Sequence, residues 1–269
     1  MTRTTGACLL LLLALASGCG ETTKALDASG PDLPSLEQRC GSAAAGVAAT
    51  VGWFRASDGV LLDGAAFGSG KTGIVLAHQS PADLCGWVPY APALSGTGFR
   101  VLLIDHRGFG LSQSPIATSR CGRFSRDLTG AVAELRHEGA DKVFLMGASF
   151  GGVTSMVAGS RLGSRVAGVV SVSGEPHLAN ACGAGRELNA ELDALAAVPE
   201  LRTPFLILGS RKDGYLLPER ARELERRAGA RHKRLVLFPG GDHGWDILET
   251  APQRGRAHRL LVAFLRRYD

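Results

Sequence analysis

The sequence has few aromatic residues and no strong excess of charge. Phe, Trp and Tyr make up 6% of its 269 residues, and 30 Lys and Arg against 25 Asp and Glu give a formal charge of +5. The basic residues are spread out, and their densest run, 218–234, interleaves Glu with Arg at helical spacing, as on a solvated helix face. No nucleic-acid partner is therefore expected. A mean hydropathy near zero argues against both a disordered chain and a polytopic membrane protein.

The chain also lacks a Cys-x-x-Cys pair and any internal repeat. Without cysteines at metal-ligand spacing, no zinc site is expected, and the chemistry described below requires neither a metal nor an organic cofactor. The length suits one compact domain with a substantial core, and we expect a monomer.

An apolar run near the N-terminus, from about Ala7 to Ala16, is too short to span a bilayer and suits a secretion signal. The residues around it, ending in Ala-Ser-Gly-Cys at 16–19, resemble a bacterial lipobox. That resemblance implies cleavage before Cys19, lipidation of Cys19 and a membrane anchor in the cell envelope. Ala16 stands where Leu is commoner, so a secreted soluble protein is the alternative.

These features predict three regions. Residues 1–18 form the lipoprotein-type signal peptide, and the polar segment 19–40, with Pro and Gly, reads as a flexible tether. Residues 41–269 form the folded domain.

Export changes the interpretation of the remaining cysteines. When Cys8 and Cys19 are set aside, four cysteines remain. An even number of cysteines in an oxidising compartment indicates two disulfides, and four cysteines allow three pairings. Buried free thiols are the alternative. The four residues are Cys40, Cys85, Cys121 and Cys182.

Short apolar runs alternate with helical patterns over most of the chain. The runs lie at 73–78, 100–106, 142–147, 166–174, 204–210 and 233–240, and helical periodicity lies at 126–139, 151–162, around 187–197, and within 218–234 and 256–268. Two β-type runs flanking Asp58-Gly59 predict a hairpin before them. This order predicts an α/β fold: a mostly parallel, doubly wound sheet with an antiparallel N-terminal hairpin. No large lid is expected, since about 29 residues separate the runs at 166–174 and 204–210.

Polar residues follow these strands at the edge where ligands gather in open α/β sheets. Ser149 lies in Gly-Ala-Ser-Phe-Gly after one strand, Asp213 follows a later strand, and His243 follows the last. A serine hydroxyl needs a base to take its proton, and imidazole titrates near neutral pH and can later protonate the leaving group. The carboxylate would hold the imidazole in its productive tautomer. The order Ser, Asp, His therefore predicts a catalytic triad.

Four segments carry a family resemblance: DHRGFGLS (105–112), GASFGG (147–152), GSRKDGYLLPE (209–219) and GGDHGW (240–245). From about Val47 to the C-terminus, the chain resembles α/β-hydrolase-fold serine esterases of the compact, lidless type, such as dienelactone-hydrolase-like and serine-aminopeptidase-like families. The resemblance implies an oxyanion hole made by the backbone N–H groups of Ser80 and Phe150. The chain departs from the family at Gln79, where Gly commonly follows His78, so Gln79 is the alternative second donor.

Several residues compete for these roles. Glu175 and Asp242 are rival acids, although Asp242 is adjacent to His243 and would have difficulty reaching the far ring nitrogen. His177 is the rival base. Asp105 and Arg107 are expected to brace a turn rather than to catalyse.

The sequence thus predicts a serine hydrolase that cleaves a small-molecule carboxylic ester, thioester or small amide through an acyl-enzyme. A peptidase with the same triad is one alternative. A surface-anchored binding protein on the same scaffold is another, since a fold does not fix function.

Overall fold

The computed structural model describes Leu26 and residues 30–114, 123–178 and 190–269. Its strands, in chain order, are β1 (Thr50–Arg55), β2 (Leu61–Phe67), β3 (Thr72–Ala77), β4 (Arg100–Ile104), β5 (Lys142–Ala148), β6 (Gly168–Val172), β7 (Phe205–Ser210) and β8 (Lys233–Phe238). The described helices are α1 (Leu36–Cys40), α2 (Ala91–Ser95), α3 (Phe124–His137), α4 (Phe150–Leu162), α6 (Ala194–Ala197), α7 (Pro218–Arg227), α8 (Asp246–Glu249) and α9 (Arg254–Tyr268). Short 3₁₀ turns are η1 (Gly41–Ala44), η2 (Leu84–Trp87), η3 (Gly163–Arg165) and η4 (Val198–Glu200).

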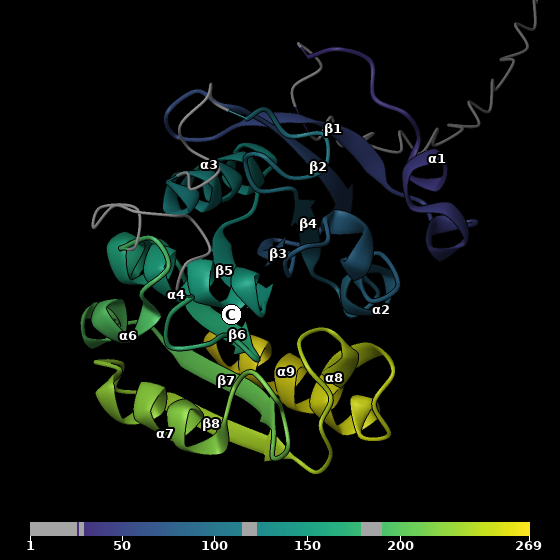
Figure 1. The fold of residues 1–269 in the computed structure, drawn as a ribbon. Coiled ribbons are helices and arrows are strands. Elements are labelled where there is room, and N and C mark those ends of the chain that lie inside the picture. The colour runs from purple at the N-terminus through teal and green to yellow at the C-terminus, as the bar shows by residue number, and fades with distance from the viewer. Residues whose placement is uncertain (1–25, 27–29, 115–122, 179–189) are drawn as a thin grey trace, which may run out of the picture.

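The strands form one eight-stranded sheet in the order β1-β2-β4-β3-β5-β6-β7-β8 (Figure 1). β1 pairs with β2 and β2 with β4 antiparallel, and the remaining neighbours are parallel. The predicted sheet with its antiparallel N-terminal hairpin is therefore confirmed. Because β3, β5, β6, β7 and β8 run in the same direction, their carboxyl ends meet at one edge.

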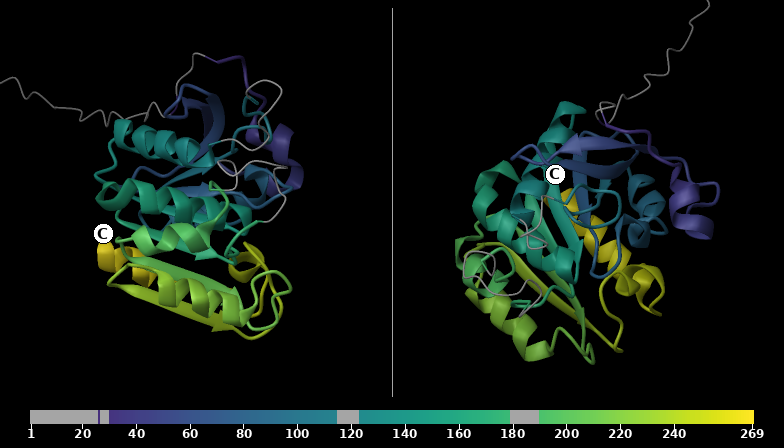
Figure 2. Two further views of the ribbon diagram at one scale, coloured as in Figure 1. Left: turned by 60° about the vertical axis from the view of Figure 1, so that its left-hand side comes forward. Right: turned by 45° about the horizontal axis from the view of Figure 1, so that its top comes forward.

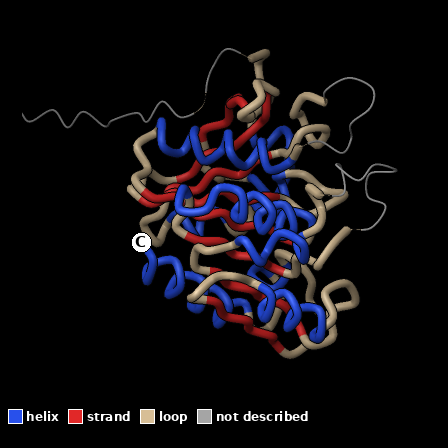
Figure 3. The backbone as a smooth tube through the Cα atoms, turned by 90° about the vertical axis from the view of Figure 1, so that its left-hand side faces the viewer, coloured by secondary structure: helices blue, strands red, loops and turns tan. Residues whose placement is uncertain are grey.

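Helices cover both faces of this sheet, as the rotated views show (Figures 2 and 3). Successive strand residues point to opposite faces, so one strand contributes to both sides. In β3, Val75 and Ala77 belong to the core under α3 and α4, whereas Ile74 and Leu76 belong to the core under α2 and α9. The near-continuous apolar runs in the sequence reflect this two-sided burial.

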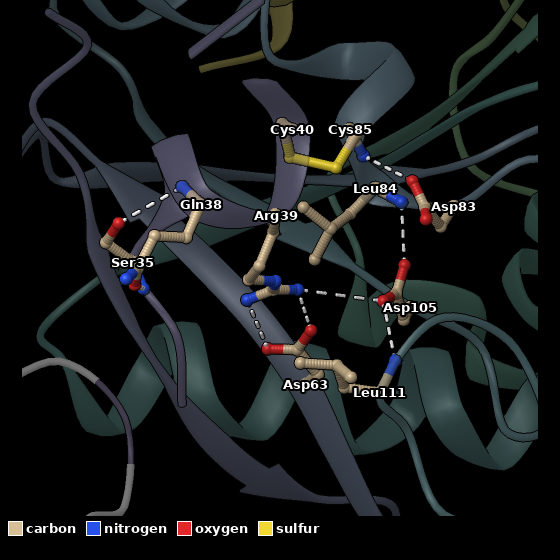
Figure 4. The surroundings of a disulfide bond; sticks show 10 residues. All are labelled: Ser35, Gln38, Arg39, Cys40, Asp63, Asp83, Leu84, Cys85, Asp105 and Leu111. Atoms are coloured by element: carbon tan, nitrogen blue, oxygen red, sulfur yellow. Dashed lines mark hydrogen bonds and ion pairs between the residues drawn. A yellow bond between two sulfur atoms is a disulfide. The ribbon is translucent and has the colours of Figure 1, made fainter. Parts of the chain in front are cut away.

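The end of the segment predicted as a tether, residues 19–40, forms helix α1 and contacts the domain. Ser35 caps α1 in a reciprocal pair with Gln38, and Leu36 packs into the core. The guanidinium of Arg39 binds the Asp63 carboxylate, with 3.0 Å from Nη1 to Oδ1, and lies 3.8 Å from Asp105 (Figure 4). The polar composition indicated mobility, but these tertiary contacts hold the helix. Residues 1–25 and 27–29 lie outside the described residues.

A disulfide joins Cys40 at the end of α1 to Cys85 in η2 (Figure 4). This is one of the bonds that the cysteine count allowed. Cys121 and Cys182, like Cys8 and Cys19, lie outside the described residues.

Within the described ranges, no helix has the length and apolar character needed to cross a membrane.

Candidate active site

Ser149 occupies the turn between β5 and α4, with φ of +47° and ψ of −113°. A positive φ is unusual for a residue with a side chain and marks a strained backbone held by its surroundings. Here the Ser149 N–H donates to the carbonyl of Val172 in β6, and its own carbonyl accepts from Val153 in the first turn of α4. These bonds fix the sharp strand-to-helix turn that the sequence motif predicted.

The two flanking glycines of the motif are required by close backbone approach. A Cβ at residue 147 would lie 2.1 Å from the carbonyl oxygen of Gly151, and a Cβ at residue 151 would lie 2.2 Å from that of Ala77. Both distances are shorter than van der Waals contact allows. Gly147 therefore allows the close approach of β5 to the start of α4, and Gly151 allows the close approach of α4 to β3.

Asp213 and His243 are joined by a hydrogen bond between the loops that follow β7 and β8. His243 Nδ1 lies 2.9 Å from both carboxylate oxygens of Asp213. The carboxylate is buried and also accepts from the N–H groups of Tyr215 and Leu216. Burial raises the pKa of Asp213, but the hydrogen bonds from His243 and Tyr215 outweigh burial and hold this pKa below its usual value. The acid is therefore ionised at neutral pH.

His243 lies between this carboxylate and a cavity. Its side chain is 19% exposed, and the ring of Tyr215 packs on it with centroids 4.7 Å apart. Because Asp213 occupies Nδ1, Nε2 is the ring nitrogen left for another partner.

The cavity has a volume of about 480 Å³ and brings together most of the predicted site residues. Ser149, His243, Ser80 and Phe150 all line it, and Asp213 lies behind His243. The complete lining is Gln79, Ser80, Pro81, Phe109, Phe124, Ser149, Phe150, Glu175, Leu178, Tyr215 and His243.

The loop after β3 is held by His78, a residue to which the sequence assigned no role. Its Nε2 accepts the backbone N–H of His106 at 3.2 Å, so Nδ1 carries the proton and donates to the Gln79 carbonyl at 3.0 Å. Burial, and secondarily the neighbouring His106, lowers the pKa of His78 to about 3, so the ring is neutral. The sequence feature that could have indicated this role is the position of His78 directly after a buried strand.

The turn after β4 is braced, as expected. Asp105 accepts from the N–H of Leu84, and the Arg107 guanidinium pairs with Asp127 and Asp58, each at 2.7 Å. His106 bonds Asp127 at 3.2 Å on its other side. None of Asp105, His106 and Arg107 lines the cavity.

None of the rival residues takes the position of Asp213 or His243. Asp242 accepts from the side chain of Gln253, and His177 is exposed and does not line the cavity. Glu175 does line the cavity, but His243 Nδ1 donates its hydrogen bond to Asp213.

Comparisons with known proteins agree with this architecture. Residues 73–183 match the family model described as "alpha/beta hydrolase fold". Among curated proteins, epoxide hydrolase B of Mycobacterium tuberculosis is 33% identical over 100 residues, covering 37% of this chain and 28% of that protein. A 2-hydroxy-6-oxononadienedioate/2-hydroxy-6-oxononatrienedioate hydrolase of Paraburkholderia phymatum is 32% identical over 111 residues, or 40% and 38% of the two chains. The match thus spans about a third of the length of these relatives.

Solved structures match over far more of the chain. An esterase of Pyrococcus furiosus superposes with a TM-score of 0.69 at 15% identity, covering 91% of this chain and 98% of the esterase. The enol-lactonase of Burkholderia xenovorans gives 0.61 at 21% identity, covering 79% and 99%. The fold is therefore the α/β-hydrolase fold, and the comparisons support an α/β-hydrolase family for this chain.

Proposed function

We propose that the protein is a serine hydrolase that cleaves a carboxylic ester, thioester or small amide through an acyl-enzyme. The observation that carries this proposal is the Asp213–His243 hydrogen bond beside a cavity that His243 shares with Ser149. Ser149 is the nucleophile, His243 the general base and then the general acid, and Asp213 the residue that orients His243.

The reaction follows from these positions. His243 Nε2 takes the proton of the Ser149 hydroxyl as Oγ attacks the carbonyl carbon of the substrate. The resulting imidazolium is stabilised by the ionised Asp213, which is within 2.9 Å of Nδ1. His243 then gives its proton to the leaving alcohol, thiol or amine, leaving an acyl group on Ser149. Water, deprotonated by His243, releases the acid and restores the serine.

Two backbone N–H groups are suited to stabilise the oxyanion. Phe150 is the first residue of α4, where N–H groups have no acceptor within the helix. In the planar peptide between Gln79 and Ser80, the C=O and N–H groups point in opposite directions. The Gln79 carbonyl is held by a hydrogen bond from His78, so the Ser80 N–H points away from His78. Phe150, Ser80 and Gln79 all line the cavity, so it is the orientation of the Gln79–Ser80 peptide that supports Ser80 as the second backbone donor. Loss of one such donor typically costs about 2.7–4 kcal/mol of transition-state stabilisation.

The relatives are named for different hydrolytic reactions. Among these reactions, the cavity of this chain favours acyl transfer from a small substrate to Ser149. A serine hydroxyl at the turn is a nucleophile suited to ester chemistry, and the structurally similar proteins of Pyrococcus furiosus and Thermogutta terrifontis are esterases. One group of relatives is named for a dicarboxylate substrate. Such a substrate is not favoured here, because the described lining of the cavity holds the acidic Glu175 and neither Lys nor Arg. Peptide cleavage by the same triad is the alternative, since it differs only in the leaving group.

The test is reaction with a fluorophosphonate, a probe that labels activated serines. We expect an adduct on Ser149, located by mass spectrometry of the peptides, and loss of the adduct in His243→Ala. Ser149→Ala should abolish turnover of p-nitrophenyl esters while leaving the circular dichroism spectrum unchanged. Ester turnover that survives in Ser149→Ala would refute the assignment, and a folded, unlabelled wild type would favour a binding protein on this scaffold.

We also propose that the protein is exported and anchored through a lipid on Cys19. The support is the lipobox-like segment and the Cys40–Cys85 disulfide, a bond typical of oxidising compartments. Cells grown with an alkyne-tagged fatty acid should label the wild type and not Cys19→Ala. Equal labelling of the two proteins would refute the anchor.

A further inference from the structure

Glu175 is an acidic side chain in the candidate active site that the proposed mechanism does not use. It follows β6, is half-buried, and lines the same cavity as Ser149 and His243. Its place in the triad is taken, because His243 Nδ1 bonds Asp213. The carboxylate therefore needs another explanation.

No cation of the described chain balances this carboxylate. Ion pairs join several buried carboxylates of the domain, such as Asp63 with Arg39 and Asp127 with Arg107, but among the described residues none joins Glu175. Asp213, a second carboxylate, lies close enough to interact with it electrostatically, and so do His243 and His177. Burial raises the pKa of Glu175, and the ionised form lacks a fixed partner.

The rest of the described lining suits a cationic group rather than an anionic one. The aromatic residues Phe109, Phe124 and Tyr215 line the cavity, and the faces of aromatic rings attract cations such as quaternary ammonium. Neither Lys nor Arg is among the described lining residues, so a substrate carboxylate would meet Glu175 without a compensating charge.

We propose that Glu175 selects substrates by charge, so that the site takes esters and amides carrying an ammonium group near the scissile bond and disfavours those carrying a carboxylate. This inference rests on the proposed hydrolase function and adds the charge class of its substrate. The ammonium would pair with Glu175, for which the described residues supply no ion-pair partner, and a neutral substrate would not pair with it.

The experiment compares three acetate esters on the purified protein. The alcohols are choline, 3,3-dimethylbutanol, which replaces the quaternary nitrogen with carbon at nearly the same size, and 2-hydroxyethanesulfonate, which is anionic. We expect kcat/KM to decrease in that order, with about a tenfold preference for the choline ester over its neutral isostere, as one partly screened charge contact provides.

Glu175→Gln keeps the size of the side chain and removes its charge. In this variant the preference for choline over the neutral isostere should fall to near one, and the anionic ester should gain relative to the other two. Glu219→Gln is the matched control, since Glu219 is exposed on α7, away from the cavity lining. It should leave all three values unchanged.

The outcomes separate the two proposals. Ester turnover with the same charge preference in wild type and Glu175→Gln would overturn the charge-selection proposal alone. An equal, large loss for all three esters would also overturn it, because Glu175 would then act through His243. Absence of both ester turnover and fluorophosphonate labelling in folded wild type would overturn the proposed function and the charge class with it.

Discussion

Asp213 shows how a single residue can be assigned a role by its partners. Several carboxylates were candidates for the acid, and they differ in what they contact. Asp213 is buried, receives two backbone N–H groups and bonds His243, whereas Asp242 bonds Gln253 and Glu175 faces the cavity. The hydrogen bonds keep Asp213 ionised despite burial, which is the state that can stabilise an imidazolium.

Replacing Asp213 with Asn should therefore remove most of the activity. The amide keeps the shape but cannot stabilise the imidazolium, and it favours the wrong tautomer of His243. We expect kcat for p-nitrophenyl acetate to fall by about 10³–10⁴-fold. Asp242→Asn is the matched control and should retain activity within about threefold. A loss in Asp242→Asn as large as that in Asp213→Asn would contradict the assignment.

At the scale of elements, the short helix α1 contributes one charged side chain, Arg39, to the interior of the domain. Arg39 carries a positive charge to two buried carboxylates on β2 and after β4, Asp63 and Asp105. Burial, with the nearby charge of Asp63, raises the pKa of Asp105 to about 8. Burial also raises the pKa of Asp63, although the charge of Arg39 opposes this rise.

Replacing Arg39 with Met should destabilise the domain because it leaves a buried carboxylate without its cation. Breaking a buried pair in this way typically costs about 3–5 kcal/mol, which urea denaturation at pH 7 would measure. The surface pair of Arg202 and Glu200, whose side chains are 63% and 73% exposed, supplies the control. Arg202→Met should cost less than about 1 kcal/mol.

The pH dependence of this penalty has a definite sign. Without Arg39, the folded-state pKa values of the two carboxyls rise further above their unfolded values near 4. A carboxyl whose pKa is raised by folding destabilises the folded state increasingly as pH rises above the unfolded pKa. The difference in unfolding free energy between wild type and Arg39→Met should therefore be small at pH 4 and grow toward pH 8. A difference that does not change with pH would show that the cost comes from packing.

At the scale of the whole molecule, we propose that the folded domain starts before residue 41. Leu26 is buried, its N–H donates to Glu134, and the Pro31 carbonyl accepts from the indole of Trp53. Together with α1, these contacts attach the N-terminal segment to β1, β2 and α3.

Two shortened chains would test this boundary. A chain that begins at Leu26 keeps these contacts and should unfold at the same urea concentration as one that begins at Cys19 with that cysteine changed to Ser. A chain that begins at Cys40 loses Arg39 and should be less stable by about 3 kcal/mol or more. If the chains that begin at residues 19, 26 and 40 are equally stable, residue 41 is supported as the start of the folded domain.

The sequence by itself determined the sheet and the order of the site residues. Apolar runs of strand length alternate with helical periodicity, and these local patterns do not depend on distant contacts, so the strands and the longer helices lie where they were predicted. The Gly-x-Ser-x-Gly turn was also visible locally, since its glycines are set by the approach of neighbouring backbone.

Only the tertiary structure decided which long-range partners meet. It joined Cys40 to Cys85, brought Arg39 to Asp63, chose Asp213 over Glu175 for His243, and showed that His78 holds the Gln79 carbonyl. Each of these contacts depends on loops that converge after the sheet has formed. A pattern read along the chain identifies residue types at strand ends, but the distances between side chains on different strands arise from packing.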